Sequence, residues 1–439
     1  MSRSIRRAAA LAAAALALAA PAASAQATSA YFSNGLSAPQ TQSHQAMLDF
    51  LSNDQPGFDL QSYPIYGSLI DRSGATYAFS TMVQRKNLDI ASLPKLSMVV
   101  EGTMIDGGNG FTQAGVGGIP ELTFPLSVTS SPWSVRSQSV AVGQLPQFVD
   151  MRVVEGRIGE PGAVYEITAD AQGSLPSGAP AGPMKVYVRA RDTIGFGYWG
   201  WGPSGFSPQW LFANQRDAVV NRFGGSLGNY LKATGDPMTN QGSYYYSSPG
   251  IVVEQFAIAV NGRVIARGRR GTLNMDLVTQ TFDQSADTVV DNGVQWLEFT
   301  IMDPTHAQGF KVGEVSQASV GTLKYASGFH AGGPITKAGL RIPTSRWKMS
   351  DIGINPIAGS QWTSPRSGLT YDMRWKVTLF DKRRDHRGSM TMTAVHDDQE
   401  ITVSGRSVYE GLFHVRGTID GQPINALAWA EIQAAGALD

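Results

Sequence analysis

None of the six histidines stands at the spacing of a metal site. Histidines that share one metal ion usually converge from short, regular intervals along the chain. No such interval separates His44, His306, His330, His386, His396 and His414. The chain has no cysteine, which excludes thiolate ligands and thiolate nucleophiles. We expect neither a metal ion nor another cofactor.

A serine hydrolase of the α/β type is not indicated either. Its nucleophile lies in a G-x-S-x-G motif at a sharp turn between a strand and a helix, and nothing of that form stands in a suitable context here. The chemistry that remains is acid–base catalysis by a carboxyl group in an apolar cavity. A carboxylic acid surrounded by rings tends to stay protonated, which is what a proton donor needs.

Two aromatic passages could supply the wall of such a cavity. Residues 195–202 read GFGYWGWG and include Trp199 and Trp201. Glycines between large rings let the backbone bend, so the rings could line a wall for a polyene, terpenoid or aromatic ligand, or could simply fill the core. Tyr244, Tyr245 and Tyr246 could orient a substrate, with packing in a strand as the alternative.

Alternating apolar and polar residues predict β-strands along most of the chain. In residues 371–379 every second position is apolar: Tyr371, Met373, Trp375, Val377 and Leu379. This period of two gives a strand one buried and one exposed face. Asn261-Gly262 and Asp420-Gly421 each separate two such runs and predict hairpin turns.

The composition favours an all-β, turn-rich protein, since 49 glycines and 23 prolines punctuate these runs. The antiparallel meanders are expected to curl around a cavity. One or two short helices are also expected, over residues 45–51 and over residues 207–225. The second prediction rests on Ser207 followed by Pro208, which is a good helix start.

The first 25 residues have the pattern of a signal peptide. Arg3, Arg6 and Arg7 precede an alanine-rich apolar run, and Ala23-Ser24-Ala25 is a small-residue cleavage site. We expect cleavage after Ala25 and a periplasmic or secreted protein. No later stretch reaches the ~18 apolar residues of a membrane-spanning helix.

The charge pattern gives no reason to expect a nucleic-acid partner. The formal net charge is 0 and only 16% of residues are charged, whereas nucleic-acid binding requires a basic surface. The expected partner is a hydrophobic small molecule. The sequence leaves the oligomeric state open.

Five short motifs near the C-terminus occur in an order typical of one family. They are SPRSG at 364–368, Arg374-Trp375, Asp398-Gln399-Glu400, Tyr409-Glu410-Gly411 and Trp429-Ala430-Glu431. This order resembles the C-terminal lipocalin-like half of the carotenoid 1,2-hydratase family. That family also includes hydroxyneurosporene synthase, kievitone hydratase, AttH-like secreted proteins and fungal Diels–Alderases. The resemblance covers residues 60–434 and is closest after residue 244.

The resemblance implies two lipocalin-like antiparallel β-barrel or β-sandwich domains. The expected domains are residues 26–290 and 291–439, with the boundary in the polar stretch at 285–292. Residues 295–299 match the aromatic strand that opens the family's C-terminal domain. Trp296 in that strand is therefore a candidate cavity wall, and Glu298 a further candidate site residue.

The resemblance also selects one carboxyl group. The family carries a segment of Trp, an apolar residue and Asp, and this chain has Asn274-Met275-Asp276 at that position. Asp276 is our candidate catalytic acid, with an ordinary turn or capping aspartate as the alternative, and Asn274 is a candidate substrate contact. Glu410 and Glu431 are expected to fix hydrogen bonds at strand ends rather than take part in chemistry.

The implied activity is acid-catalysed hydration or dehydration of an isoprenoid, polyene or aryl-alkene in an apolar pocket near the domain interface. An acid protonates the alkene, water captures the carbocation, and aromatic faces stabilise the charge. Two alternatives stay open. The Diels–Alderase members imply a cyclase or isomerase that works by orienting a polyene, and a lipocalin-like barrel can be a non-catalytic carrier.

Overall fold

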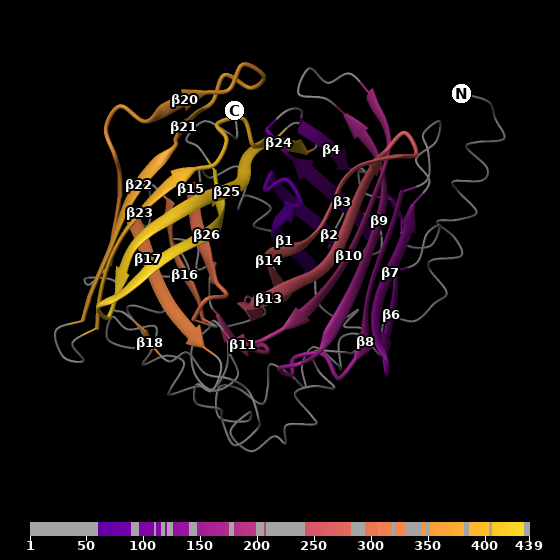
Figure 1. The fold of residues 1–439 in the computed structure, drawn as a ribbon, viewed down its shortest axis with the longest axis horizontal. Coiled ribbons are helices and arrows are strands. Elements are labelled where there is room, and N and C mark those ends of the chain that lie inside the picture. Colours follow the sequence, from indigo (N-terminus) through magenta and orange to yellow (C-terminus); the bar gives the residue numbers. More distant parts are fainter. Residues whose placement is uncertain are drawn as a thin grey trace.

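Two curled antiparallel sheets stand side by side (Figure 1). The computed structural model describes residues 60–88, 96–108, 111–115, 119–120, 126–139, 147–174, 180–198, 206–207, 242–281, 295–306, 308–317, 321–330, 345–346, 352–381, 386–403 and 406–433. Every regular element in these ranges is a β-strand, so the all-β prediction is confirmed. The expected signal peptide and helices lie outside the described residues, except that Ser207 ends strand β12 (Phe206–Ser207).

The first sheet holds 14 strands, with most of them in the order β4-β3-β2-β1-β14-β13-β10-β9-β8-β7-β6. Their bounds are β1 Leu60–Asp71, β2 Thr76–Leu88, β3 Leu96–Asp106, β4 Phe111–Gly115, β5 Ile119–Pro120, β6 Ser127–Ser130, β7 Trp133–Ser139, β8 Gln147–Glu155, β9 Val164–Ser174, β10 Pro180–Asp192, β11 Gly197–Tyr198, β13 Gly242–Val260 and β14 Arg263–Thr281. Strands β11 and β12 pair with β13, and β5 pairs with β3. The sheet curls far enough that β4 contacts β9.

The second sheet holds ten strands, nine of them in the order β18-β17-β16-β15-β26-β25-β23-β22-β19. Their bounds are β15 Gln295–Asp303, β16 Gln308–Gln317, β17 Gly321–His330, β18 Ser345–Arg346, β19 Ile352–Pro356, β22 Arg374–Asp381, β23 His386–Ala394, β25 Arg406–Ile419 and β26 Gln422–Ile432. Strand β24 (Glu400–Val403) pairs with β25, and β20 (Gln361–Thr363) with β21 (Thr370–Asp372). The predicted boundary at 285–292 falls between β14 and β15, outside the described residues. No helix in the described ranges is long and apolar enough to cross a bilayer.

Both predicted hairpin turns occur where the sequence placed them. Asn261 and Asp420 have φ values of 52° and 50°, and the glycine after each is also left-handed. Asparagine and aspartate tolerate this region better than other non-glycine residues. These turns fix the register of β13 with β14 and of β25 with β26, and so determine which side chains face inward.

Each sheet encloses its own hydrophobic core, because alternate residues point into the curl. The first core includes Ile65, Val186 and Leu273, and the second includes Phe299, Val377 and Phe413. The five predicted inward residues of 371–379 all lie in the second core. Their polar neighbours face outward, as the period of two requires.

The family-like motifs of the second domain form one hydrogen-bonded unit. The carboxylate of Glu400 is fully buried and accepts hydrogen bonds from Ser364, Ser367 and Tyr371 at 2.5–2.9 Å. Arg366 donates to the Glu400 carbonyl at 2.8 Å and pairs with Asp398. The SPRSG and DQE motifs therefore hold the C-terminal sheet together at the β20–β21 and β24 end.

Glycine is required where β1 approaches β14. Gly67 has φ +151°, and a Cβ atom there would lie 2.1 Å from the Thr272 carbonyl oxygen. We expect Gly67→Ala to lower the free energy of unfolding by about 3 kcal/mol or more, since both backbone strain and a backbone clash would have to be relieved. Urea denaturation measures this change.

Gly74→Ala is the matched control. Gly74 also has a positive φ, +93°, but no atom lies within 4 Å of the position of its Cβ. We expect a loss of only about 1 kcal/mol there. Equal losses at the two positions would show that the close approach at Gly67 has no energetic weight.

Candidate active site at the domain interface

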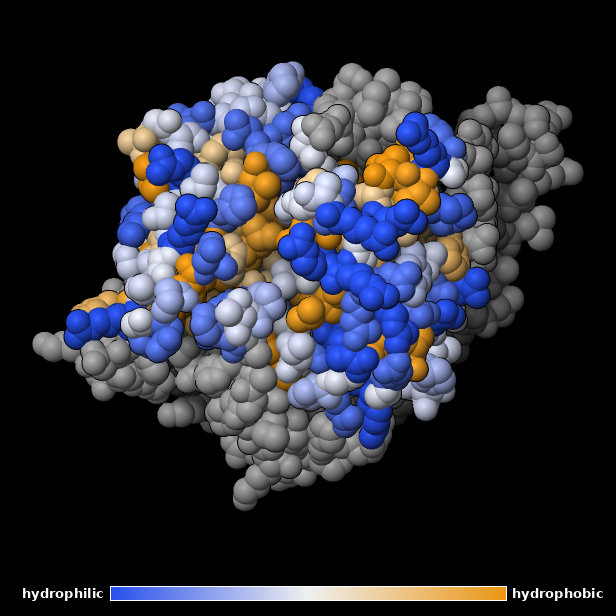
Figure 2. Space-filling model, viewed as in Figure 1, coloured by the Kyte–Doolittle hydropathy of each residue, from blue (hydrophilic) through white to orange (hydrophobic). Residues whose placement is uncertain are grey.

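The two domains meet through β1, β13 and β14 of the first sheet and β15, β16, β25 and β26 of the second (Figure 1). A third hydrophobic cluster lies between them, separate from the two cores: Tyr66, Ala78, Met104, Met302, Leu412 and Trp429. Figure 2 shows apolar surface continuing between the two halves of the molecule. Next to this cluster lies a group of buried charged side chains.

Lys311 of β16 is the centre of the charged group. Its side chain is fully buried. The Nζ atom lies 3.0 Å from Asp276 Oδ2, 3.0 Å from Glu298 Oε1 and 3.2 Å from Tyr66 Oη. Asp276 and Tyr66 belong to the first domain, so the ammonium group joins the domains through charge-assisted hydrogen bonds.

Strand register brings the partners of Asp276 together. Tyr66 on β1 is opposite Asn274 on β14, and Ser247 on β13 is opposite Asp276. Asn274 and Asp276 are two residues apart and share one face of β14. Asp276 accepts hydrogen bonds from Tyr66 at 2.7 Å, from Asn274 Nδ2 at 2.7 Å and from the Ser247 hydroxyl.

These surroundings differ from the ring-lined pocket expected around Asp276. With Lys311, four donor groups point at its two oxygens. A carboxylate only accepts hydrogen bonds, so this geometry suits Asp276 as an acceptor. The proton-donor role expected from the sequence stays a prediction.

The protonation of Lys311 and Tyr66 follows from the same contacts. Burial alone would lower the pKa of Lys311, but the charges of Asp276 and Glu298 outweigh it and leave the pKa raised. Burial, then Asp276, Glu298 and Glu431, raise the pKa of Tyr66 well above its usual value. The site thus holds a charged ammonium and a neutral phenol, which donates to Asp276.

Three glutamates form a row across the face of the second sheet that meets the first domain. Glu298 on β15 is opposite Glu431 on β26, which is opposite Glu410 on β25. Directly opposed side chains on one face have Cβ atoms about 5 Å apart. Trp429 Nε1 donates to Glu410 Oε2 at 2.6 Å. The sequence offered Glu410 and Glu431 as hydrogen-bond anchors, and for Glu410 the tryptophan contact fits that expectation.

Close spacing of acids in a half-buried row favours protonation of some of them. Burial raises the pKa of Glu410 to about 8, with the hydrogen bond from Trp429 opposing the shift and Glu298 adding to it. Burial and the neighbouring carboxyls of Glu410 and Glu298 raise the pKa of Glu431 well above its usual value. Near neutral pH the row therefore holds protons beside a carboxylate–lysine pair.

Aromatic surface lies against this group. The rings of Tyr66 and Trp429 are 5.3 Å apart at an interplanar angle of 34°, and Lys311 Nζ lies 5.9 Å from the Tyr66 ring centre. The two rings come from different domains. The site therefore combines aromatic faces, a carboxylate and protonated carboxyl groups.

One buried acceptor of the group has no partner among the described residues. Asn274 is fully buried, and its Nδ2 donates to Asp276, but its Oδ1 accepts no hydrogen bond. A buried carbonyl without a donor is costly. It therefore marks a position at which a hydroxyl group or a water molecule could bind.

The structure brings together three of the residues selected from the sequence: Asn274, Asp276 and Glu298. Tyr246 instead packs in the core of the first domain, next to Ser247 but on the other face of β13. The remaining candidates cannot be placed in the site. Trp199 and Trp201 lie outside the described residues, as do the side chains of Tyr244, Tyr245 and Trp296.

Sequence reasoning missed Tyr66, Ser247, Lys311 and Trp429. Lys311 stands between Phe310 and Val312, and a lysine at an alternate position of a strand normally indicates a solvent-exposed face. Of these residues only Trp429 had a signal in the sequence. It belongs to the WAE motif at 429–431, and a tryptophan and a glutamate on one face of a strand can form a pair. Among the described residues, no three histidine or carboxylate side chains are grouped as metal ligands.

Comparison with known proteins supports the fold. No family model matches the sequence, and no curated protein matches it. Two solved structures do. An AttH-like protein from Nitrosomonas europaea has a TM-score of 0.56 and 16% identity over 88% of this chain and 95% of its own. Kievitone hydratase from Nectria haematococca has a TM-score of 0.51 and 11% identity over 86% and 89%.

These matches define the class of protein: a two-domain, lipocalin-like all-β fold. Both structures carry names from the group that the C-terminal motifs resemble, so the resemblance seen in the sequence is confirmed at the level of the fold. At this identity the likeness extends to the fold alone. What the site does has to be argued from its own side chains.

The lysine at the centre of the site should dominate interface stability. Lys311→Met would leave Asp276 and Glu298 buried without their cation, so we expect a loss of about 3–5 kcal/mol of unfolding free energy at pH 7. Urea denaturation at pH 7 measures it.

Lys185→Met is the matched control. Lys185 pairs with Asp170 at 2.5 Å, but the two side chains are 68% and 31% exposed. Removal of such a surface pair changes stability by about 0–1 kcal/mol. A Lys311→Met protein as stable as this control would contradict the assignment of a buried interdomain pair.

The protonated glutamate row predicts a specific dependence of stability on pH. A carboxyl with a raised pKa in the folded state binds its proton more tightly there than in the unfolded chain. Its contribution to the stability of the folded protein is present at low pH. That contribution is lost as the pH rises through the pKa of the folded state, which is about 8 for Glu410. We expect the Tm of the wild type to fall between pH 5 and pH 9 relative to that of Glu410→Gln.

Glutamine retains an oxygen for Trp429 but cannot titrate, so Glu410→Gln isolates the proton. Asp397→Asn, at an exposed position of the same domain, should leave the pH profile unchanged. Parallel profiles for the wild type and Glu410→Gln, from differential scanning fluorimetry, would mean that Glu410 is already ionised at neutral pH.

Proposed function

We propose that this chain is an exported hydro-lyase that adds water to, or removes it from, a carbon–carbon double bond of an apolar isoprenoid, polyene or aryl-alkene. The reaction would take place at the interface between the two domains. The observation that carries the proposal is the unpartnered, buried Oδ1 of Asn274 beside the Asp276 carboxylate.

The Asn274–Asp276 pair fits the oxygen that is added or removed. A water molecule or tertiary alcohol that donates to Asn274 Oδ1 would lie near Asp276, because Asn274 itself contacts Asp276 at 2.7 Å. In the hydration direction, Asp276 would accept the proton that water loses as its oxygen attacks carbon. General-base catalysis of this kind typically contributes about 10²–10⁴ in rate.

The proton for the alkene would come from the glutamate row. Glu431 lies between Glu298 and Glu410 and feels the charges of Asp276 and Lys311, so it is close to the reacting group. Its protonated carboxyl would donate to one alkene carbon and leave a carbocation on the other. Glu410, next to it, would replace the proton. The proton that Asp276 takes from water would return to Glu410 through solvent, so that the cycle closes with no net change in protons. Dehydration would use the same groups in reverse.

The surroundings suit a developing positive charge. One ammonium, Lys311, faces two carboxylates, Asp276 and Glu298, so the ion-paired centre carries a net charge of −1. The faces of Tyr66 and Trp429 add the negative potential of aromatic rings. A carbocation is stabilised in such a place without rearrangement of the site.

The named structural neighbour is consistent with this proposal. Kievitone hydratase carries hydration in its name, and it shares the two-domain fold with this chain. The proposal for this chain nevertheless rests on the side chains of its own interface. The signal peptide predicted for residues 1–25 supports export.

Asp276→Asn provides the test. With a candidate isoprenoid or aryl-alkene, we expect turnover by the purified protein to fall by at least about 10²-fold, because asparagine cannot accept the proton, while binding of the substrate is kept. Asp170→Asn, which alters a surface ion pair, should keep full turnover. Turnover is followed by mass spectrometry and binding by fluorescence quenching.

The product mass separates the proposal from its alternatives. Hydration adds one water and dehydration removes one, whereas a cyclase gives an isomer of unchanged mass. A carrier binds the compound and returns it unaltered. Full activity of Asp276→Asn, or a product of unchanged mass, would overturn the assignment.

A further inference from the structure

The β13–β14 hairpin carries a cluster of arginines that the first domain does not neutralise. Four of them belong to β14, and the fifth lies in the β1–β2 turn: Arg263, Arg267, Arg269, Arg270 and Arg72. All five are exposed. The turn is tied to the strand by a hydrogen bond from Arg72 N to the Arg267 carbonyl oxygen at 3.3 Å. We call this group the arginine hairpin.

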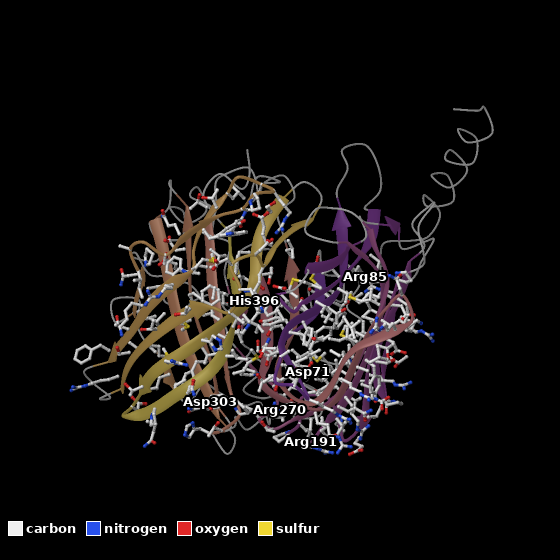
Figure 3. All side chains as sticks on the ribbon, turned by 45° about the horizontal axis from the view of Figure 1, so that its top comes forward. Asp71, Arg85, Arg191, Arg270, Asp303 and His396 are labelled. Carbon is white, nitrogen blue, oxygen red and sulfur yellow. The ribbon has the colours of Figure 1, made fainter. Side chains whose placement is uncertain are left out.

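No ion pair joins these arginines to an acid of the described residues. Asp71 at the end of β1 lies opposite Gly268 of β14, and Figure 3 shows it near Arg270. Its carboxylate, however, accepts hydrogen bonds from Ser73 N, Ser73 Oγ and Ala75 N at 2.6–3.0 Å. Asp71 keeps its negative charge, but five arginines against this one carboxylate still leave the local charge strongly positive on a chain whose formal net charge is 0.

The arginines on neighbouring strands behave differently. Three arginines of β8 and β10 pair with three glutamates of β8, β9 and β13: Arg152, Arg189 and Arg191 with Glu155, Glu166 and Glu254. That cluster is neutral. These three arginines are thus matched by acids, whereas those of the arginine hairpin form no ion pair with the described residues.

The tip of the same hairpin is apolar. Val264 and Ile265 are 55% and 49% exposed. They are two of the four exposed large hydrophobic residues in the described part of the chain. They stand next to each other, directly after Arg263 and before Arg267. An apolar tip flanked by basic residues is typical of a surface that inserts into a lipid interface.

We propose that the arginine hairpin docks the protein onto an anionic membrane surface. The guanidinium groups bind lipid phosphates through paired hydrogen bonds, and Val264 and Ile265 enter the boundary between headgroups and acyl chains. A soluble polyanion would engage the arginines but leave the two apolar side chains in water. The combination therefore favours a bilayer.

The position of the hairpin connects the membrane with the domain interface. Strand β14 runs from the arginines directly to Asn274 and Asp276. From Arg270 to Asp276 is six residues, or about 20 Å of extended strand. A protein docked in this way would hold its interface close to the phase in which apolar molecules dissolve. The docking itself does not depend on the reaction proposed above.

Vesicle flotation with the full chain tests the docking. We expect binding to vesicles of phosphatidylcholine with about one third phosphatidylglycerol and little binding to phosphatidylcholine alone, because an anionic surface attracts the basic residues. Binding should be lost as salt rises, because salt screens that attraction. Arg267→Gln/Arg269→Gln should weaken the partition coefficient by about fivefold for each arginine removed.

Arg152→Gln/Lys185→Gln is the control, since it removes two exposed but ion-paired cations and changes the net charge equally. It should bind vesicles as the wild type does. Val264→Ser/Ile265→Ser should weaken binding to anionic vesicles but leave binding to soluble polyphosphate unchanged. Thermal melting of each variant confirms that it is folded.

Three results would overturn the proposal. The first is no binding of the wild type to anionic vesicles at low salt. The second is an equal loss in the charge-matched control. The third is unchanged vesicle binding by Val264→Ser/Ile265→Ser, which would identify the hairpin as a site for a soluble polyanion. None of these outcomes bears on turnover at Asp276.

Discussion

The structure depends on one buried ammonium group. Lys311 lies on the second domain, and among its contacts Glu298 comes from the same sheet while Asp276 and Tyr66 come from the other domain. A fully buried lysine is stable only if its charge is compensated. Separation of the domains would leave it with only Glu298 of these three partners and would expose the apolar cluster around Trp429. The charge therefore specifies how the two curled sheets face each other, and the apolar contacts enlarge the interface that is buried.

The strand pattern explains why this interface can carry chemistry. Each sheet buries one face in its own core, and the alternate residues of the same strands form the interface. Leu273 and Met275 pack inward while Asn274 and Asp276 point outward, and Phe299 packs inward while Glu298 and Thr300 do not. The fold can thus vary the polar face for function without changing the cores. The second domain uses a separate set of buried contacts, around Glu400, to hold its own motifs.

How much of this could be predicted from the sequence depends on the range of the interaction. The hairpins at Asn261-Gly262 and Asp420-Gly421 and the alternation at 371–379 are local, and they were correct to within a residue or two. Asp276, Asn274 and Glu298 were selected by resemblance, and the structure brings them together. Lys311 and Tyr66 could not be selected, because they are 245 residues apart and each fits an ordinary alternating strand. The sheet registers and the contact between domains decide their roles, and neither has a local signature.

The role of Asp276 shows why the composition of a site does not fix its chemistry. A carboxyl group among aromatic residues suggests a protonated acid, and the sequence analysis expected tyrosine and tryptophan rings around Asp276. In the fold, Tyr246 turns into the core, whereas Lys311, Ser247 and Tyr66 supply donors. The protons are instead held one sheet away, on the paired Glu410 and Glu431, where burial and mutual repulsion raise the pKa. In the proposed reaction the proton donors and the proton acceptor would come from different domains, so catalysis would need the interface intact.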